Sequence, residues 1–117
     1  MSDEWTSQQT SIYKPDNWVM IKIYNNGEPF YKIVGGWSGG YLDGNSWRIN
    51  SGVTKVEETE DRYFFYGSSG SVYKCRKDSN MVRMNIANIV KSVEDNPGVG
   101  MVMPEHTNYM ELNYEIN

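Results

Sequence analysis

Short runs of alternating apolar and polar residues, each bounded by turn residues, are the sequence feature that most constrains this fold. In residues 18–24, Val19, Ile21 and Ile23 share one face, which is the pattern of a β-strand. Residues 25–29 follow with the sequence Asn-Asn-Gly-Glu-Pro, and an Asn-Gly pair readily adopts the positive φ angles of a tight hairpin turn. Residues 30–34 alternate again, so the sequence predicts an antiparallel hairpin.

The same reading extends along the chain, with further strands expected at 47–49, 53–56, 62–66, 72–77 and 101–103, and a short one at 81–84. The chain ends in near-perfect alternation, with Met110, Leu112, Tyr114 and Ile116 on one side. We predict a C-terminal strand there with one side in solvent, able to pair within its own sheet or with a neighbouring molecule.

Only one segment has helical periodicity. Ile86, Ile89, Val90 and Val93 form a single apolar stripe. Asn85 is a suitable N-cap, and Asn-Pro-Gly at 96–98 ends the helix. We expect an α-helix at about 85–95.

These elements predict a mainly β protein, a β-rich α+β fold. The expected architecture is a small antiparallel barrel or curled sheet of about six to seven strands, with the late helix covering one opening or face. Residues 1–17 have little apolar periodicity and are expected to form a polar N-terminal arm, attached through residues such as Ile12 and Tyr13. Residues 18–117 are expected to form one β-rich domain.

Charge and composition exclude several classes of function. The formal net charge of −4 argues against nonspecific nucleic-acid binding, which requires many lysine and arginine contacts to phosphate. This net charge is still compatible with a local basic patch. The single cysteine cannot form an intrachain disulfide, which favours a reducing, cytoplasmic setting. No apolar run approaches the roughly 20 residues that span a bilayer, and the N-terminus lacks the pattern of a secretion signal.

The residues that usually carry catalysis are sparse. His106 is the only histidine and lies in a polar segment, where a surface role is the simplest interpretation. We expect no metal site, because metal binding needs several ligands at set spacings. Cys75 lies within a predicted strand and is expected in the core. We therefore predict a protein that is not an enzyme and has no cofactor.

The stretch from Gly35 to Gly52 is the most site-like segment, with six glycines, two tryptophans and an arginine in eighteen residues. Its aromatic rings could cover the end of the barrel and fill space left by the glycines, anchor a protein partner, or stack a flat ligand beside an arginine that holds a phosphate. The candidate binding residues of this stretch are Trp37, Ser38, Tyr41, Trp47 and Arg48.

A second candidate segment is Gly-Ser-Ser-Gly-Ser at 67–71, followed by a strand. It lacks the Gly-Lys-Ser/Thr ending and the following helix of a P-loop. It is either a plain hairpin turn or a turn whose backbone N–H groups bind an anion. Its candidate binding residues are Ser68, Ser69, Ser71 and Tyr73.

Residues 31–77 carry two runs, Tyr-Lys-Ile-Val-Gly-Gly-Trp-Ser-Gly-Gly-Tyr-Leu-Asp-Gly-Asn-Ser-Trp-Arg-Ile-Asn-Ser-Gly and Phe-Tyr-Gly-Ser-Ser-Gly-Ser-Val-Tyr-Lys-Cys. In these runs the chain resembles small uncharacterised proteins of marine T4-like bacteriophages. The resemblance implies a phage origin and the cytoplasm of an infected host, and it implies no activity.

Two hypotheses of function follow. The first is a phage accessory protein that engages a protein partner or itself as a homodimer, through its aromatic loops or its C-terminal strand. The second is a protein that sequesters a nucleotide-like ligand between Trp37, Trp47 and Tyr73, with Arg48 and the 67–71 turn at the phosphate. Ligand-dependent thermal stability and light scattering distinguish the two.

Overall fold

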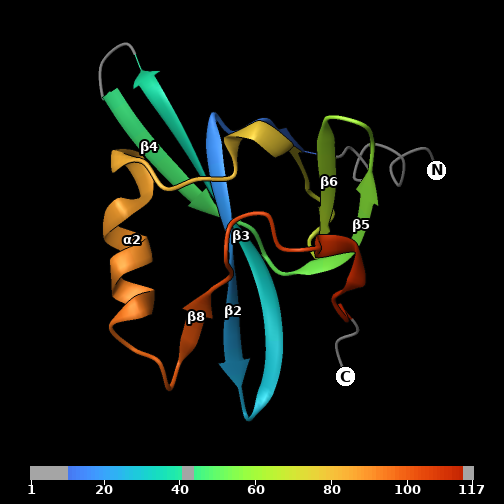
Figure 1. The fold of residues 1–117 in the computed structure, drawn as a ribbon, viewed down its shortest axis with the longest axis vertical. Helices are drawn as coiled ribbons and strands as arrows, with labels where there is room; N and C mark the ends of the chain where they lie inside the picture. Colours follow the sequence, from blue (N-terminus) through green and yellow to red (C-terminus); the bar gives the residue numbers. More distant parts are fainter. Residues whose placement is uncertain (1–10, 41–43, 115–117) are drawn as a thin grey trace, which may run out of the picture.

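The computed structural model describes residues 11–40 and 44–114, which form two four-stranded sheets and one α-helix (Figure 1). One sheet has the order β1-β7-β6-β5 and the other the order β4-β3-β2-β8. The strands are β1 (Ile12–Tyr13), β2 (Asn17–Asn25), β3 (Glu28–Gly40), β4 (Gly44–Ile49), β5 (Val53–Glu58), β6 (Arg62–Gly67), β7 (Val72–Arg76) and β8 (Gly100–Val102). The helices are α2 (Met84–Glu94) and the 3-10 turns η1 (Lys77–Ser79) and η2 (Tyr109–Glu111).

This architecture confirms the mainly β prediction with one late helix. The two curled sheets face each other and do not close into a barrel. The expected hairpin at 18–34 is formed by β2 and β3, and Asn26 and Gly27 have φ angles of 55° and 82°, as a primed turn requires.

Strand β2 lies in the middle layer and is buried on both faces. Val19 and Ile21 pack against Ile86 and Val90 of α2, which lies over the outer face of its sheet (Figure 1). On the opposite face of β2, Trp18 and Met20 face the other sheet in a second cluster. Because its side chains alternate between two faces, β2 contributes to both cores. The molecule therefore has three layers: the helix, the sheet that contains β2, and the second sheet.

The cluster between the sheets is rich in aromatic rings. Trp18, Phe65 and Tyr109 have ring centroids 5.3 to 5.8 Å apart, a spacing typical of stabilising aromatic pairs. Cys75 is fully buried beside them, as predicted, and its burial raises the pKa of its thiol well above the ordinary value.

Three local predictions were wrong. The N-cap of α2 is Arg83, not Asn85; Asn85 lies inside the first turn, where its side chain exchanges hydrogen bonds of 3.0 and 2.7 Å with that of the buried Asn17. Residues 81–83 form no strand. The C-terminal alternation forms no strand over residues 110–114 either, because Tyr109 and Tyr114 pack against the aromatic cluster instead.

The arm predicted at 1–17 lies partly outside the described residues. Ile12 and Tyr13, expected to attach it, form β1 and pair in parallel with Val72 and Tyr73. No helix among the described residues is long and apolar enough to cross a membrane.

Candidate functional site

A cavity of about 280 Å³ lies where β1, β7 and the end of β4 meet two turns. We call it the inter-sheet cavity. Side chains and backbone of both sheets line it: Ser11, Tyr13, Arg48, Ile49, Asn50, Ser51, Ser69, Gly70, Ser71 and Tyr73. None of these residues is acidic, so the described part of the lining offers no charge that would repel an anion.

Asn50 lines the cavity and is 4 % exposed. Its backbone N–H donates to the Ile33 carbonyl at 3.0 Å, and its Oδ1 accepts from the Ile33 N–H at 3.0 Å. These two bonds fix the orientation of the amide. Asn50 Nδ2 is then the one buried side-chain nitrogen or oxygen atom of the described residues without a hydrogen-bond partner. A buried donor left unpaired costs about 1–3 kcal/mol, and this donor belongs to a residue that lines the cavity.

Gly67 packs closely against the side chains beside this amide. A Cβ atom at position 67 would lie 2.9 Å from Ser51 Oγ, 3.0 Å from Ser71 Oγ and 3.5 Å from Asn50 Nδ2. A side chain at position 67 would therefore displace the two serine hydroxyls, so glycine is what lets them and the Asn50 amide pack closely here.

Arg48 supplies the positive charge. Its guanidinium lies over the ring of Tyr13, with Cζ 4.7 Å from the ring centroid, in the cation–π arrangement that arginine favours. Arg48 forms no ion pair with any other residue in the described ranges. Its N–H donors are therefore available to an anion, for which a guanidinium has matching geometry.

Tyr73 completes the wall of the cavity. Burial raises the pKa of its hydroxyl to about 12, and the nearby Arg48 acts in the opposite direction. The hydroxyl is therefore protonated at neutral pH and remains a hydrogen-bond donor. Tyr13 packs against Tyr73 with ring centroids 5.0 Å apart, so the aromatic wall is continuous.

Of the residues predicted from sequence, the cavity brings together Arg48, Ser69, Ser71 and Tyr73. The 67–71 turn contributes side chains rather than backbone donors. The N–H groups of residues 67–70 donate within the protein, to Ser71 O, Gly52 O, Ser51 Oγ and Gly67 O respectively. Ser68 is exposed and does not line the cavity.

The two tryptophans do not face one space. In the β3–β4 register, Trp47 pairs with Gly36 and Trp37 pairs with Ser46, and alternation therefore puts the two rings on opposite faces of the sheet. Trp37 shares its face with Arg48 and contacts Tyr13 at a centroid distance of 6.3 Å. Trp47 is 51 % exposed.

Ser38, another predicted residue, lies away from the cavity. Ser38 accepts a hydrogen bond from Asn85 Nδ2 at 2.9 Å, and its backbone N–H donates to Asp16. Tyr41 lies outside the described residues.

Sequence reasoning missed Tyr13, Asn50 and Ser51. The Asn-Ser-Gly sequence at 50–52 indicates only a turn between two strands. The burial of Asn50 depends on the second sheet lying over it, which no local pattern encodes.

Comparison of the chain with protein-family models gave no match, and comparisons with curated proteins and with solved structures gave none either. Function must therefore be inferred from the chemistry of the cavity.

Proposed function

We propose that this protein is a small binding domain that holds a nucleotide-like or other small anionic ligand in the inter-sheet cavity. The phosphate or carboxylate of the ligand would accept hydrogen bonds from Arg48, Asn50 Nδ2, Ser71 and Tyr73. The proposal refines the nucleotide hypothesis: the anion is held by side chains, and the flat surfaces are Tyr13 and Tyr73 rather than two tryptophans.

The unpaired Asn50 amide is the observation that carries this proposal. A buried N–H₂ group with its Oδ1 already bonded needs an acceptor. The surrounding groups are all donors or neutral, and none is a carboxylate. An anionic oxygen is the acceptor that suits such surroundings best.

The size of the cavity limits the ligand. Pockets for drug-sized molecules usually measure about 300–1,000 Å³, and this cavity has about 280 Å³. A phosphorylated sugar or a nucleoside monophosphate is therefore the upper limit for full enclosure. Among the described residues that line the cavity, none is a histidine, lysine or carboxylate that could act as a general base, which favours binding over catalysis.

Engagement of a protein partner or of a second copy is the other candidate, and one observation favours it: Trp47 is exposed on β4, an edge strand of its sheet. The C-terminal strand expected to support it is absent over residues 110–114. The resemblance of residues 31–77 to phage proteins stays a prediction.

Isothermal titration calorimetry with adenosine monophosphate, adenosine and inorganic phosphate tests the proposal. We expect the monophosphate to bind and adenosine to bind at least tenfold more weakly, since only the phosphate can satisfy Asn50 and Arg48. Equal binding of the two, or no heat from the monophosphate or from phosphate, would contradict an anion site.

Two substitutions assign the binding to the cavity. Asn50→Asp retains the acceptor for the Ile33 N–H and replaces the unpaired donor with a negative oxygen, so we expect at least tenfold weaker binding. Arg48→Met removes the charge without breaking an ion pair among the described residues, and we expect a similar loss. Lys91→Met on α2 removes an exposed charge elsewhere and is the matched control; an equal loss there would contradict the assignment.

A further inference from the structure

A second and larger cavity lies on the other side of β7. Alternation places Tyr73 in the inter-sheet cavity and its neighbour Lys74 in this one, which has a volume of about 440 Å³. We call it the cationic cleft. Its lining residues are Lys14, Pro15, Asp16, Arg62, Lys74, Arg76, Asp78, Ser79 and Arg83.

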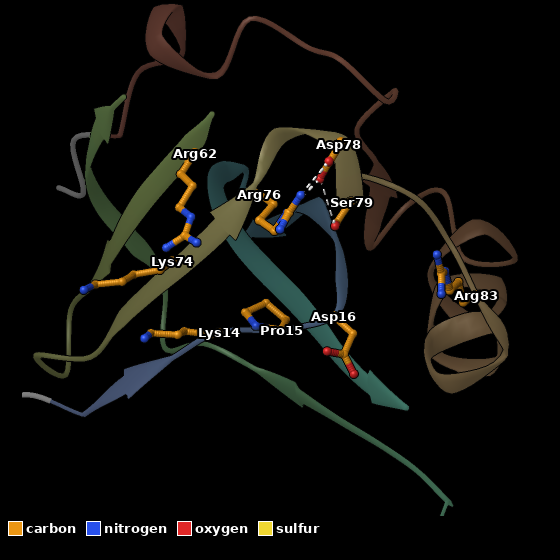
Figure 2. Close-up of a pocket in the computed structure, with 9 residues that line it drawn as sticks. All are labelled: Lys14, Pro15, Asp16, Arg62, Lys74, Arg76, Asp78, Ser79 and Arg83. Carbon is orange, nitrogen blue, oxygen red and sulfur yellow. Dashed lines mark hydrogen bonds and ion pairs between the residues drawn. The ribbon is translucent and has the colours of Figure 1, made fainter. Parts of the chain in front are cut away.

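The cleft concentrates positive charge in a protein that is negative overall. Five of the eleven lysines and arginines of the chain line it, against two carboxylates. Figure 2 shows Lys14, Arg62 and Lys74 gathered on one side, Arg76 beside them, and Arg83 farther along near α2. The cationic groups therefore extend across the cleft rather than surround one point.

The two acids of the cleft already have partners. Asp78 accepts two hydrogen bonds from Arg76, at 3.0 and 2.8 Å (Figure 2), and these bonds hold the pKa of its carboxyl below the ordinary value. Asp16 Oδ2 accepts from the Ser38 N–H at 2.8 Å. Lys14, Arg62 and Arg83 form no ion pair within residues 11–40 and 44–114. Lys74 forms none there either, so four of the five cations are left without a counter-charge from the described chain.

The register of β6 and β7 makes this cluster unfavourable for stability. Arg62 lies directly opposite Arg76, and Lys74 lies opposite Phe64, one pair farther along the same face. Like charges directly opposite each other on a sheet are destabilising. Asp78 offsets the charge of Arg76 but not that of Arg62, so packing alone does not account for the arrangement.

Phe64 adds an aromatic surface to the same face. Its ring is half-buried, and Lys74 Nζ lies 5.3 Å from the ring centroid. Cations alternating with an aromatic ring on an open sheet face are the combination that binds single strands, in which phosphates meet the cations and a base stacks on the ring.

We propose that the cationic cleft and Phe64 bind a single strand of nucleic acid, with consecutive phosphates along Lys74, Arg62 and Arg83. At about 0.1 M salt the net charge of −4 does not oppose this, because charges are then screened beyond about 10 Å and the local field dominates. This site is separate from the proposed ligand cavity, and each can fail without the other.

Fluorescence anisotropy of a labelled oligothymidylate of roughly ten nucleotides, a length within the usual range for such surfaces, tests the proposal at several salt concentrations. We expect binding at low salt that weakens steeply as salt rises, with a logarithmic slope of about −0.7 per phosphate contacted. Arg62→Met and Lys74→Met should each weaken binding about tenfold and make the slope shallower. Phe64→Leu should weaken binding at least fivefold, since stacking contributes about 1–3 kcal/mol per base.

Controls separate this site from its alternatives. Lys91→Met should leave oligonucleotide binding unchanged. Because Arg62 faces Arg76, Arg62→Met should melt at the same temperature as the native protein or higher, so lost binding could not be attributed to unfolding. Absence of binding at low salt, an equal loss in Lys91→Met, or displacement by inorganic tripolyphosphate as effective as by unlabelled oligonucleotide would overturn the proposal.

Discussion

At the scale of single residues, Gly36 shows how closely α2 approaches the sheet. A Cβ atom at position 36 would lie 2.5 Å from Asn85 Oδ1 and 2.7 Å from Asn85 Nδ2. Asn85 is buried and bonds to Asn17 and Ser38. The missing side chain of Gly36 is therefore what allows this polar network to join β3, β2 and the helix.

Gly36→Ala tests that role. The methyl group would displace the Asn85 amide and leave buried polar atoms without partners, so we expect the free energy of unfolding to fall by about 2–3 kcal/mol. Urea denaturation measures the change. Gly98→Ala is the matched control, because a Cβ at position 98 has no atom within 4 Å; an equal loss in both variants would contradict this role for Gly36.

At the scale of elements, β2 and β4 differ in how many of their edges pair with other strands. β2 is paired on both sides, by β3 and β8. Among the described strands, β4 pairs with β3 alone and lies at the edge of its sheet, with Trp47 exposed on it. An open edge strand with an exposed aromatic ring is suited to antiparallel pairing with a second copy, which closes as a two-fold dimer.

Light scattering coupled to size-exclusion chromatography measures whether β4 pairs in this way. We expect a mass approaching twice that of the monomer at high concentration, and a return to monomer in Trp47→Lys. Met84→Lys is the control, since Met84 is also apolar and is 85 % exposed, but on α2. A monomer at every concentration, or a dimer insensitive to Trp47→Lys, would exclude pairing through β4.

At the scale of the whole molecule, buried tyrosine hydroxyls link stability to alkaline pH. Burial raises the pKa values of Tyr73 and Tyr109 to about 12, and it also raises that of Tyr114. The unfolded chain ionises these groups near pH 10 and the folded protein does not. Above pH 10 the unfolded state therefore binds fewer protons, so the free energy of unfolding falls as pH rises toward 12.

Tyr73→Phe tests this linkage cleanly, because the Tyr73 hydroxyl has no hydrogen-bond partner among the described residues. The variant should lose less stability between pH 9 and pH 12, by on the order of 2 kcal/mol, measured by urea denaturation across that range. Tyr24→Phe, at an exposed position, should behave like the native protein. Parallel pH profiles for Tyr73→Phe and the native chain would contradict the linkage.

What the sequence determined by itself was local. The alternation of β2, the Asn-Gly turn before β3, the apolar stripe of α2 and the core position of Cys75 all follow from periodicity and turn chemistry, which act over a few residues. These features were sufficient to predict a mainly β fold with one late helix, and they placed Arg48, Ser69, Ser71 and Tyr73 among the candidate site residues.

Only the tertiary structure decided how these pieces meet. The alternation at 110–114 is consistent with a strand, but Tyr114 donates a hydrogen bond to the Tyr109 carbonyl at 2.6 Å and both rings pack with the aromatic cluster. The sequence around Asn50 indicates a turn. In the folded protein the side-chain N–H₂ group of Asn50 is a buried, unpaired donor, because the second sheet covers it. Arg62 and Arg76 are fourteen positions apart in sequence, and strand register sets them side by side. Burial and cross-strand contact are properties of distant segments brought together, so local patterns do not contain them.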